Sequence, residues 1–176
     1  DYYVRVPGII KEDLESLSER LLKLKGLKGV LTSNQGLIRL LKGRIRLLGD
    51  YKLNLLNSYG AALYEACDGL MVSEEASKKE LSALKNKEHF VVGVYGPQEM
   101  MVLEHCLTKK EEGPCQCDLS RHYLEDQKGY KLPIAKDLFC RNHIYNGVVK
   151  NILGEMKELR KIGYKSFIME LFLDDH

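Results

Sequence analysis

Short apolar runs rich in β-branched and aromatic residues alternate along the chain with segments in which aliphatic residues recur every three or four positions. The runs at 2–6, 30–31, 69–73, 90–95 and 167–172 predict strands, and the run at 90–95, closed by Gly96 and Pro97, is the clearest. The periodic segments at 14–24, 36–41, 59–66 and 152–162 predict helices. Such alternation is typical of βα units around a largely parallel sheet, so the predicted fold class is α/β.

Two parts of the chain depart from this alternation. Residues 44–48 and 52–56 are both expected to be extended, joined at Gly49 and Asp50. From 100 to 146 the alternation ends, and residues 122–124 and 130–132 predict a hairpin around 126–129. We therefore expect one domain over residues 1–176, with an irregular cysteine and hairpin region at 100–146.

Polar residues follow several of the predicted strands: Asn34, Asp50, Asn54, Asn57, Ser73 and Glu74. In a (β/α) barrel the chemistry lies at the carboxyl ends of the strands, so this pattern suits a barrel. An open, doubly wound sheet would produce much the same pattern. Because strand-like runs stand at both ends of the chain, we expect the domain to extend beyond the given residues, with an N-terminal part absent. Exposed edge strands would then make it self-associate.

Composition narrows the functional classes only slightly. The net charge of +2, from 27 basic and 25 acidic residues, neither predicts nor excludes a nucleic-acid partner. No apolar run has the length needed to cross a bilayer.

The five cysteines are unevenly distributed. Cys67 stands alone and is expected to be a buried structural thiol, whereas Cys106, Cys115, Cys117 and Cys140 fall within one stretch. Four thiolates suit either a tetrahedral zinc or an iron–sulfur cluster, although the spacing is not that of a ferredoxin or a zinc finger. The alternative is that these are incidental thiols in a variable loop.

Three stretches resemble the collagenase-like peptidase family U-thirty-two: residues 49–58, residues 94–97 followed by 101–106, and residues 123–130 running on to 140–146. The resemblance implies a partial TIM-like (β/α) barrel of bacterial, cytoplasmic origin whose earliest strands belong to a missing N-terminal part. The family name implies a hydrolase, a collagenase-like protease. Other members resemble RNA- or quinone-hydroxylating proteins with an iron–sulfur cluster on four cysteines. The pair Cys115 and Cys117 is more closely spaced than in those members.

Four residues are candidates for orienting a reactant: Asn54, Asn57, Arg141 and His143. Arg141 is suited to pair with an anionic group through two parallel hydrogen bonds, and His143 could act as an acid, a base or a ligand. The sequence displays no protease centre, because it has neither a His-Glu-x-x-His helix nor a Gly-x-Ser-x-Gly elbow.

The sequence leaves three functions open. The first is a metal- or iron–sulfur-dependent enzyme that modifies RNA or another large substrate. The second is a peptidase acting on collagen-like or other peptides, as the family name says. The third is a non-enzymatic binding module in which zinc only holds the loop together.

Overall fold

The computed structural model describes residues 1–107, 122–137 and 139–171, which form two compact units. Unit 1 consists of Asp1–Gly93 and Glu155–Ile168. Unit 2 consists of the described residues of Val94–Gly154 and Met169–His176.

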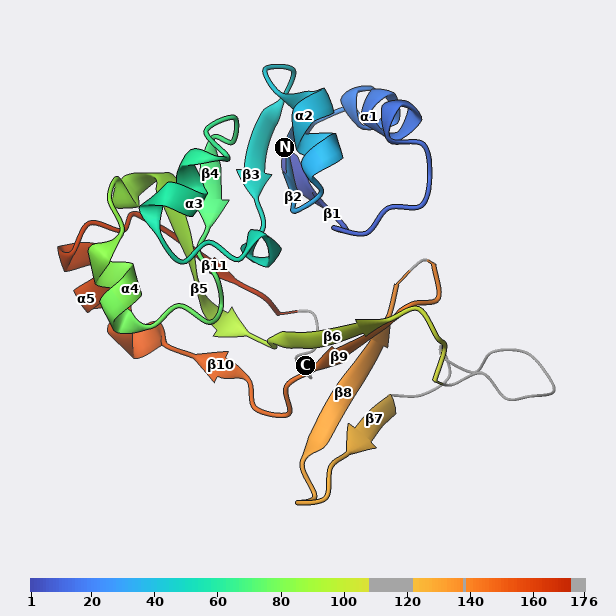
Figure 1. The fold of residues 1–176 in the computed structure, drawn as a ribbon, viewed down its shortest axis with the longest axis vertical. Helices are drawn as coiled ribbons and strands as arrows, with labels where there is room; N and C mark the ends of the chain where they lie inside the picture. Colours follow the sequence, from blue (N-terminus) through green and yellow to red (C-terminus); the bar gives the residue numbers. More distant parts are fainter. Residues whose placement is uncertain (108–121, 138, 172–176) are drawn as a thin grey trace. The chain divides into compact units, whose positions relative to one another are not determined.

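The core of unit 1 is a parallel sheet in which each strand pairs with the strand that precedes it in the chain (Figure 1). Its strands are β1 (Tyr2–Val6), β2 (Leu27–Thr32), β3 (Arg46–Gly49), β4 (Gly69–Met71) and β5 (Phe90–Gly96). The order β1-β2-β3-β4-β5 runs in one direction without a reversal. Strands β2 to β4 are rich in valine and leucine and are buried at most positions, as expected for a parallel sheet.

Short helices connect these strands: α1 (Leu14–Leu22), α2 (Gln35–Leu41), α3 (Ser58–Ala62), α4 (Lys78–Ala83) and, after unit 2, α5 (Met156–Lys161). The first four begin at side chains that accept a backbone N–H, namely Asp13, Asn34, Asn57 and Ser77. Apolar residues of α2 such as Leu37 and Leu41 are fully buried, so α2 contributes much of the core.

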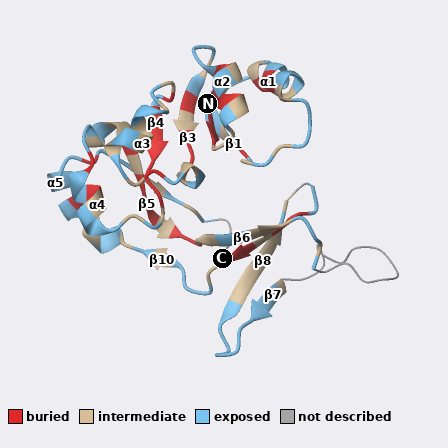
Figure 2. Ribbon diagram, in the orientation of Figure 1, coloured by how far each residue is buried: buried red, intermediate tan, exposed pale blue. Residues whose placement is uncertain are grey.

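Unit 2 is built around a four-stranded antiparallel sheet. Its strands are β6 (Glu99–Leu103), β7 (His122–Glu125), β8 (Lys131–Lys136) and β9 (Asn142–Tyr145), in the order β6-β9-β8-β7. The short strand β10 (Lys150–Asn151) pairs with the end of β5, and β11 (Ser166–Met169) also pairs with β5. Most of β7 and β8 is exposed or half-buried (Figure 2).

The α/β class and the parallel sheet are confirmed, and so are the strands at 2–6 and 90–95 and the hairpin around 126–129. The extended segment expected at 52–56 is wrong. The chain instead forms the 3₁₀ turn η1 (Tyr51–Leu53), because Leu53 and Asn54 donate their N–H groups to Asp50 and Tyr51. The helix expected at 59–66 ends at Ala62. Residues 100–146 do break the alternation, but the described part contains regular antiparallel strands.

Candidate functional site

The topology of unit 2 carries Cys106 and Cys140 to the same end of its sheet. Strands β6 and β9 are antiparallel, and Leu103 at the end of β6 is paired with Asn142 at the start of β9. Cys106 follows this pair and Cys140 precedes it. The N–H of Leu107 donates to Oδ1 of the buried Asn142 at 2.7 Å, which fixes the segment after Cys106 to β9. Two of the four predicted ligands, Cys106 and Cys140, therefore lie on segments connected to the same end of the sheet.

Only two of the four predicted ligands, Cys106 and Cys140, lie within the described residues. Cys106 is half-buried and Cys140 is exposed. Cys115 and Cys117 lie outside the described residues. Within the described ranges, no three His, Cys, Asp or Glu side chains converge as a possible metal-binding group. Cys67 is buried as expected, and burial together with the charge of Asp68 raises the pKa of its thiol to about 11.

Cys140 lies in a turn that unit 2 contains twice. In the turn 137–141, Oδ1 of Asp137 accepts the N–H groups of Phe139 and Arg141, and the backbone of Asp137 bonds to Cys140 and Arg141. In the turn 126–130, Asp126 makes the corresponding bonds to the residues two, three and four positions later. The two turns therefore have the same pattern of hydrogen bonds, in which the first residue is an aspartate that bonds to the backbone of the residues after it.

The fourth position of each turn has a left-handed backbone. Gly129 occupies it in the first turn with φ +81°, and Cys140 occupies it in the second with φ +59°. Glycine adopts this conformation without steric cost, whereas a side chain with a Cβ costs roughly 1–2 kcal/mol there. A cysteine at this position is therefore held against its backbone preference, which is typical of residues kept for function.

Asp137 also joins the second turn to two predicted site residues. Its Oδ2 lies 2.6 Å from both Nε and Nη2 of Arg141, whose side chain is 3% exposed, and 3.4 Å from Nε2 of His143. On the other side of the ring, Nδ1 of His143 lies 2.6 Å from Glu99 Oε2. The guanidinium of Arg141 is thus bound by a carboxylate of its own chain, and Glu104 Oε1 lies 3.9 Å from Nη1.

This environment favours the charged form of Asp137. Burial by itself raises the pKa of the carboxyl, but hydrogen bonds from Arg141, Phe139 and His143 outweigh burial and hold the pKa below its usual range. The arrangement is an internal ion-pair network that fixes the turn bearing Cys140. Sequence reasoning identified Arg141 and His143 but missed Asp137, Glu99 and Glu104. The spacing of four residues between Asp137 and Arg141 was the available signal.

Asn54 and Asn57, the other predicted site residues, lie in unit 1. Asn54 has a left-handed backbone, and its Oδ1 accepts a hydrogen bond from Ser73 Oγ at 2.6 Å, so it links the segments that follow β3 and β4. Asn57 accepts the N–H groups of Tyr59 and Gly60 and begins α3. The structure thus brings Arg141 and His143 together around Asp137, while Asn54 and Asn57 have positions in another unit.

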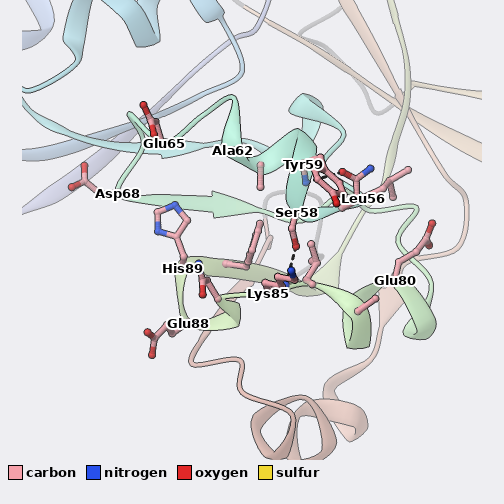
Figure 3. A pocket seen from close by; sticks show the side chains of 16 residues that line it. Leu56, Ser58, Tyr59, Ala62, Glu65, Asp68, Glu80, Lys85, Glu88 and His89 are labelled. Carbon is pink, nitrogen blue, oxygen red and sulfur yellow. Dashed lines mark hydrogen bonds between the residues drawn. The ribbon is translucent and has the colours of Figure 1, made fainter.

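Asn57 also lines a cavity of about 1280 Å³ in unit 1, between the segments of α3 and α4 (Figure 3). Ser58 on one wall accepts the N–H of Lys85 on the other at 2.9 Å. Four carboxylates line the cavity: Glu65, Asp68, Glu80 and Glu88. Glu80 is engaged by Ser77 at the start of α4, and Glu88 is paired with Lys165, so these two side chains hold local structure.

Comparisons with known proteins add no further assignment. No family model matches the chain, and no curated protein and no solved structure matches it. Over the part of the chain that the structure describes, no helix has the length and apolarity to traverse a bilayer. A functional conclusion therefore depends on the geometry of the two units and on the sequence resemblance.

Proposed function

We propose that the chain is part of a metal- or iron–sulfur-dependent enzyme that modifies RNA or another large substrate, related to the bacterial, cytoplasmic U-thirty-two proteins that it resembles. The observation that carries this proposal is the left-handed backbone of Cys140 in the turn 137–141, at the position that Gly129 occupies in the turn 126–130. Such a residue persists where its side chain is needed. Thiolate coordination of a metal or cluster is the need that its position, at the same end of the sheet as Cys106, suggests.

The strand order supports the partial (β/α) barrel in this proposal. Barrel strands follow one another around the sheet in chain order, whereas a doubly wound sheet reverses direction at a switch point. The order β1 to β5 contains no reversal. We infer that unit 1 is an arc of five barrel strands and that Asn54 and Ser73, which follow β3 and β4, lie at its mouth.

In this proposal Cys106, Cys115, Cys117 and Cys140 hold the metal or cluster. The register of β6 and β9 supports this for two of them, because Cys106 follows and Cys140 precedes the Leu103–Asn142 pair. A bound iron–sulfur cluster would supply electron transfer. Arg141 and His143 position the turn of Cys140 through Asp137, because their charged and ring nitrogens already face carboxylates of this chain. Asn54 and Asn57 orient the substrate.

The metal proposal is tested by measuring iron, zinc and acid-labile sulfide in protein purified without oxygen, together with its visible absorption. We expect iron with sulfide in the native chain. Cys140→Gly is the sharpest variant, because glycine suits the left-handed backbone. It should lose the cluster and keep its fold by circular dichroism. Cys67→Ala, which removes the thiol outside the proposed ligand set, should keep the metal content.

Two results would contradict the proposal. One is a native chain free of metal and sulfide after anaerobic purification. The other is a Cys140→Gly variant with the full metal content of the native chain. Cleavage of denatured collagen by the native chain, abolished by a point substitution, would support the peptidase function in its place.

A further inference from the structure

One segment of unit 1 carries positive charge only. Every aspartate and glutamate is absent from residues 20–46, although the whole chain is nearly balanced, with 27 basic and 25 acidic residues. The structure describes all of this segment. Its lysines and arginines form what we call the basic rim: Arg20, Lys23, Lys25, Lys28, Arg39, Lys42, Arg44 and Arg46.

The fold gathers the basic rim at the amino ends of two neighbouring strands. Its residues lie where α1 and α2 end and where β2 and β3 begin. Gly29, next to Lys28, is paired with Arg46 in the ladder of β2 and β3. Arg44 lies 2.7 Å from Glu19 of α1, so the segment after α2 is tied to α1, and the two helices lie side by side (Figure 1). Segments that are apart in the sequence thus bring their cations to one end of the sheet.

Most cations of the basic rim have no carboxylate partner. Ion pairs within the chain involve only Arg20, Lys28 and Arg44. The side chains of the others are exposed and form no ion pair, hydrogen bond or ring contact with any described residue: Lys23, Lys25, Arg39, Lys42 and Arg46. The negative end of a helix accounts for Arg39 in the last turn of α2, but Lys25 and Arg46 lie outside the helices. Because like charges repel one another, their concentration here indicates an anionic partner.

The side chains around the basic rim favour a nucleic acid over an anionic membrane. Membrane-surface binding uses a broad apolar face, whereas Leu24, 44% exposed, is the one exposed large apolar side chain within residues 20–46. The half-exposed ring of Tyr2 lies beside Gly26, with Cε1 3.6 Å from the place that a Cβ would take. Cations along a phosphate backbone, together with an aromatic ring on which a base stacks, are typical of surfaces that bind single-stranded nucleic acid.

We propose that the basic rim binds the backbone of a single-stranded nucleic acid and that Tyr2 stacks on one of its bases. The phosphates contact the cations that have no partner in the chain: Lys23, Lys25, Arg39, Lys42 and Arg46. The rim lies at the opposite end of the strands from Asn54 and Ser73, which follow β3 and β4, so it holds a different part of a long ligand from those residues. This inference goes beyond the proposed metal centre, because it needs neither the cysteines nor a metal.

The test measures binding of a fluorescent single-stranded RNA of mixed sequence to the full chain by anisotropy, over a range of salt concentrations. Lys25→Gln/Lys42→Gln/Arg46→Gln should weaken binding at least tenfold at low salt. The slope of the logarithm of the affinity against that of the salt concentration should become shallower by about 2, at roughly 0.7 for each lost contact with a single strand. Lys42→Gln alone, at an exposed position, should weaken binding about threefold and guards against misfolding of the triple variant.

Two further variants separate the rim from net charge and from stacking. Lys85→Gln/Lys157→Gln/Lys161→Gln removes the same charge from exposed positions of unit 1 outside the rim and should bind within twofold of the native chain. Tyr2→Leu should weaken binding about fivefold and leave the salt dependence unchanged, because stacking releases no counterions. Single-stranded DNA of the same sequence identifies the sugar. Equal binding assigns the rim to the phosphodiester backbone alone, and tighter binding of RNA adds a contact with the 2′-hydroxyl. Either outcome supports the inference.

Three results would overturn the inference. The native chain could bind neither RNA nor DNA at low salt, or the triple variant could bind as tightly as the native chain. The third is binding of anionic phospholipid vesicles or polyglutamate as tight as that of the RNA, which would assign the rim to another kind of anionic partner. Cys140→Gly should bind the RNA like the native chain. A failure of the rim and a failure of the metal centre are therefore separate results.

Discussion

The turns 126–130 and 137–141 of unit 2 have the same backbone hydrogen bonds but different surroundings. Asp126 bonds to the backbone of its own exposed turn. Asp137 makes the same bonds and also binds the buried Arg141 and faces His143. The first turn has Gly129 at its left-handed position, and the second has Cys140. The first turn thus has only the hydrogen bonds and the glycine that its backbone conformation requires. The second turn has in addition a cysteine in a strained conformation and an ion-pair network.

The largest expected difference between the turns comes from removing the aspartates. Asp137→Ala leaves the Arg141 guanidinium buried without its closest carboxylate, so the loss of stability should be about 3 kcal/mol, at the low end for a broken buried pair. Asp126→Ala removes only the turn bonds and should cost about 1 kcal/mol. Hydrogen exchange of the 142–145 segment, measured by mass spectrometry, would report both values. Equal losses of stability in the two variants would mean that the Asp137–Arg141 ion pair does not stabilise the fold.

Acid should weaken the second turn more than the first. The pKa of Asp137 lies below its ordinary value in the folded chain, so its ionisation stabilises the fold above the unfolded pKa of about 4. That stabilisation is lost as the pH falls through the folded pKa. Denaturant unfolding of unit 2 between pH 6 and pH 2 should show this loss in the native chain. The Asp137→Asn variant, which cannot ionise, should show a smaller pH dependence.

A substitution that adds a Cβ at the left-handed position of the first turn would measure the conformational cost that Cys140 has in the second turn. Gly129→Ala should destabilise unit 2 by roughly 1–2 kcal/mol. The cost is that of the backbone alone, because a Cβ at Gly129 would meet no atom within 4 Å. Thermal unfolding monitored by circular dichroism is sufficient. A neutral substitution would show that this turn tolerates a side chain and would weaken the case for strain at Cys140.

The smallest expected effect is the reverse substitution in the second turn. Cys140→Gly should stabilise the metal-free chain by about 0.5–1 kcal/mol, since relief of the left-handed cost exceeds the greater flexibility of glycine in the unfolded chain. The measurement is chemical denaturation of the chelator-treated proteins. Destabilisation of the metal-free chain would show that the Cys140 side chain contributes packing.

Local sequence signals predicted the parallel strands β1 to β5 and the hairpin of unit 2, but not β6, β9 or the ion-pair network. The run at 90–95 predicted β5 because β-branched residues and a closing glycine and proline act locally. The extended segment at 52–56 was wrong because the turn depends on the left-handed backbone of Asn54, which its apolar neighbours conceal. Asp137, Glu99 and His143 come together only through the pairing of β6, β8 and β9. No local pattern contains that pairing.

The interrupted course of unit 1 has a consequence for the order in which a nascent chain folds. Residues 94–154 of unit 2 are synthesised before residues 155–168 return to unit 1. These late residues include the buried Leu159 and Tyr164, and the Tyr164 hydroxyl donates to the carbonyl of Leu81 at 2.8 Å. Translation proceeds at about 5–20 residues per second, so several seconds pass between the synthesis of α4 and that of residues 155–168. During this time the surface of α4 that these residues later bury is exposed. This interval is when the growing chain is most open to chaperone binding and to misfolding.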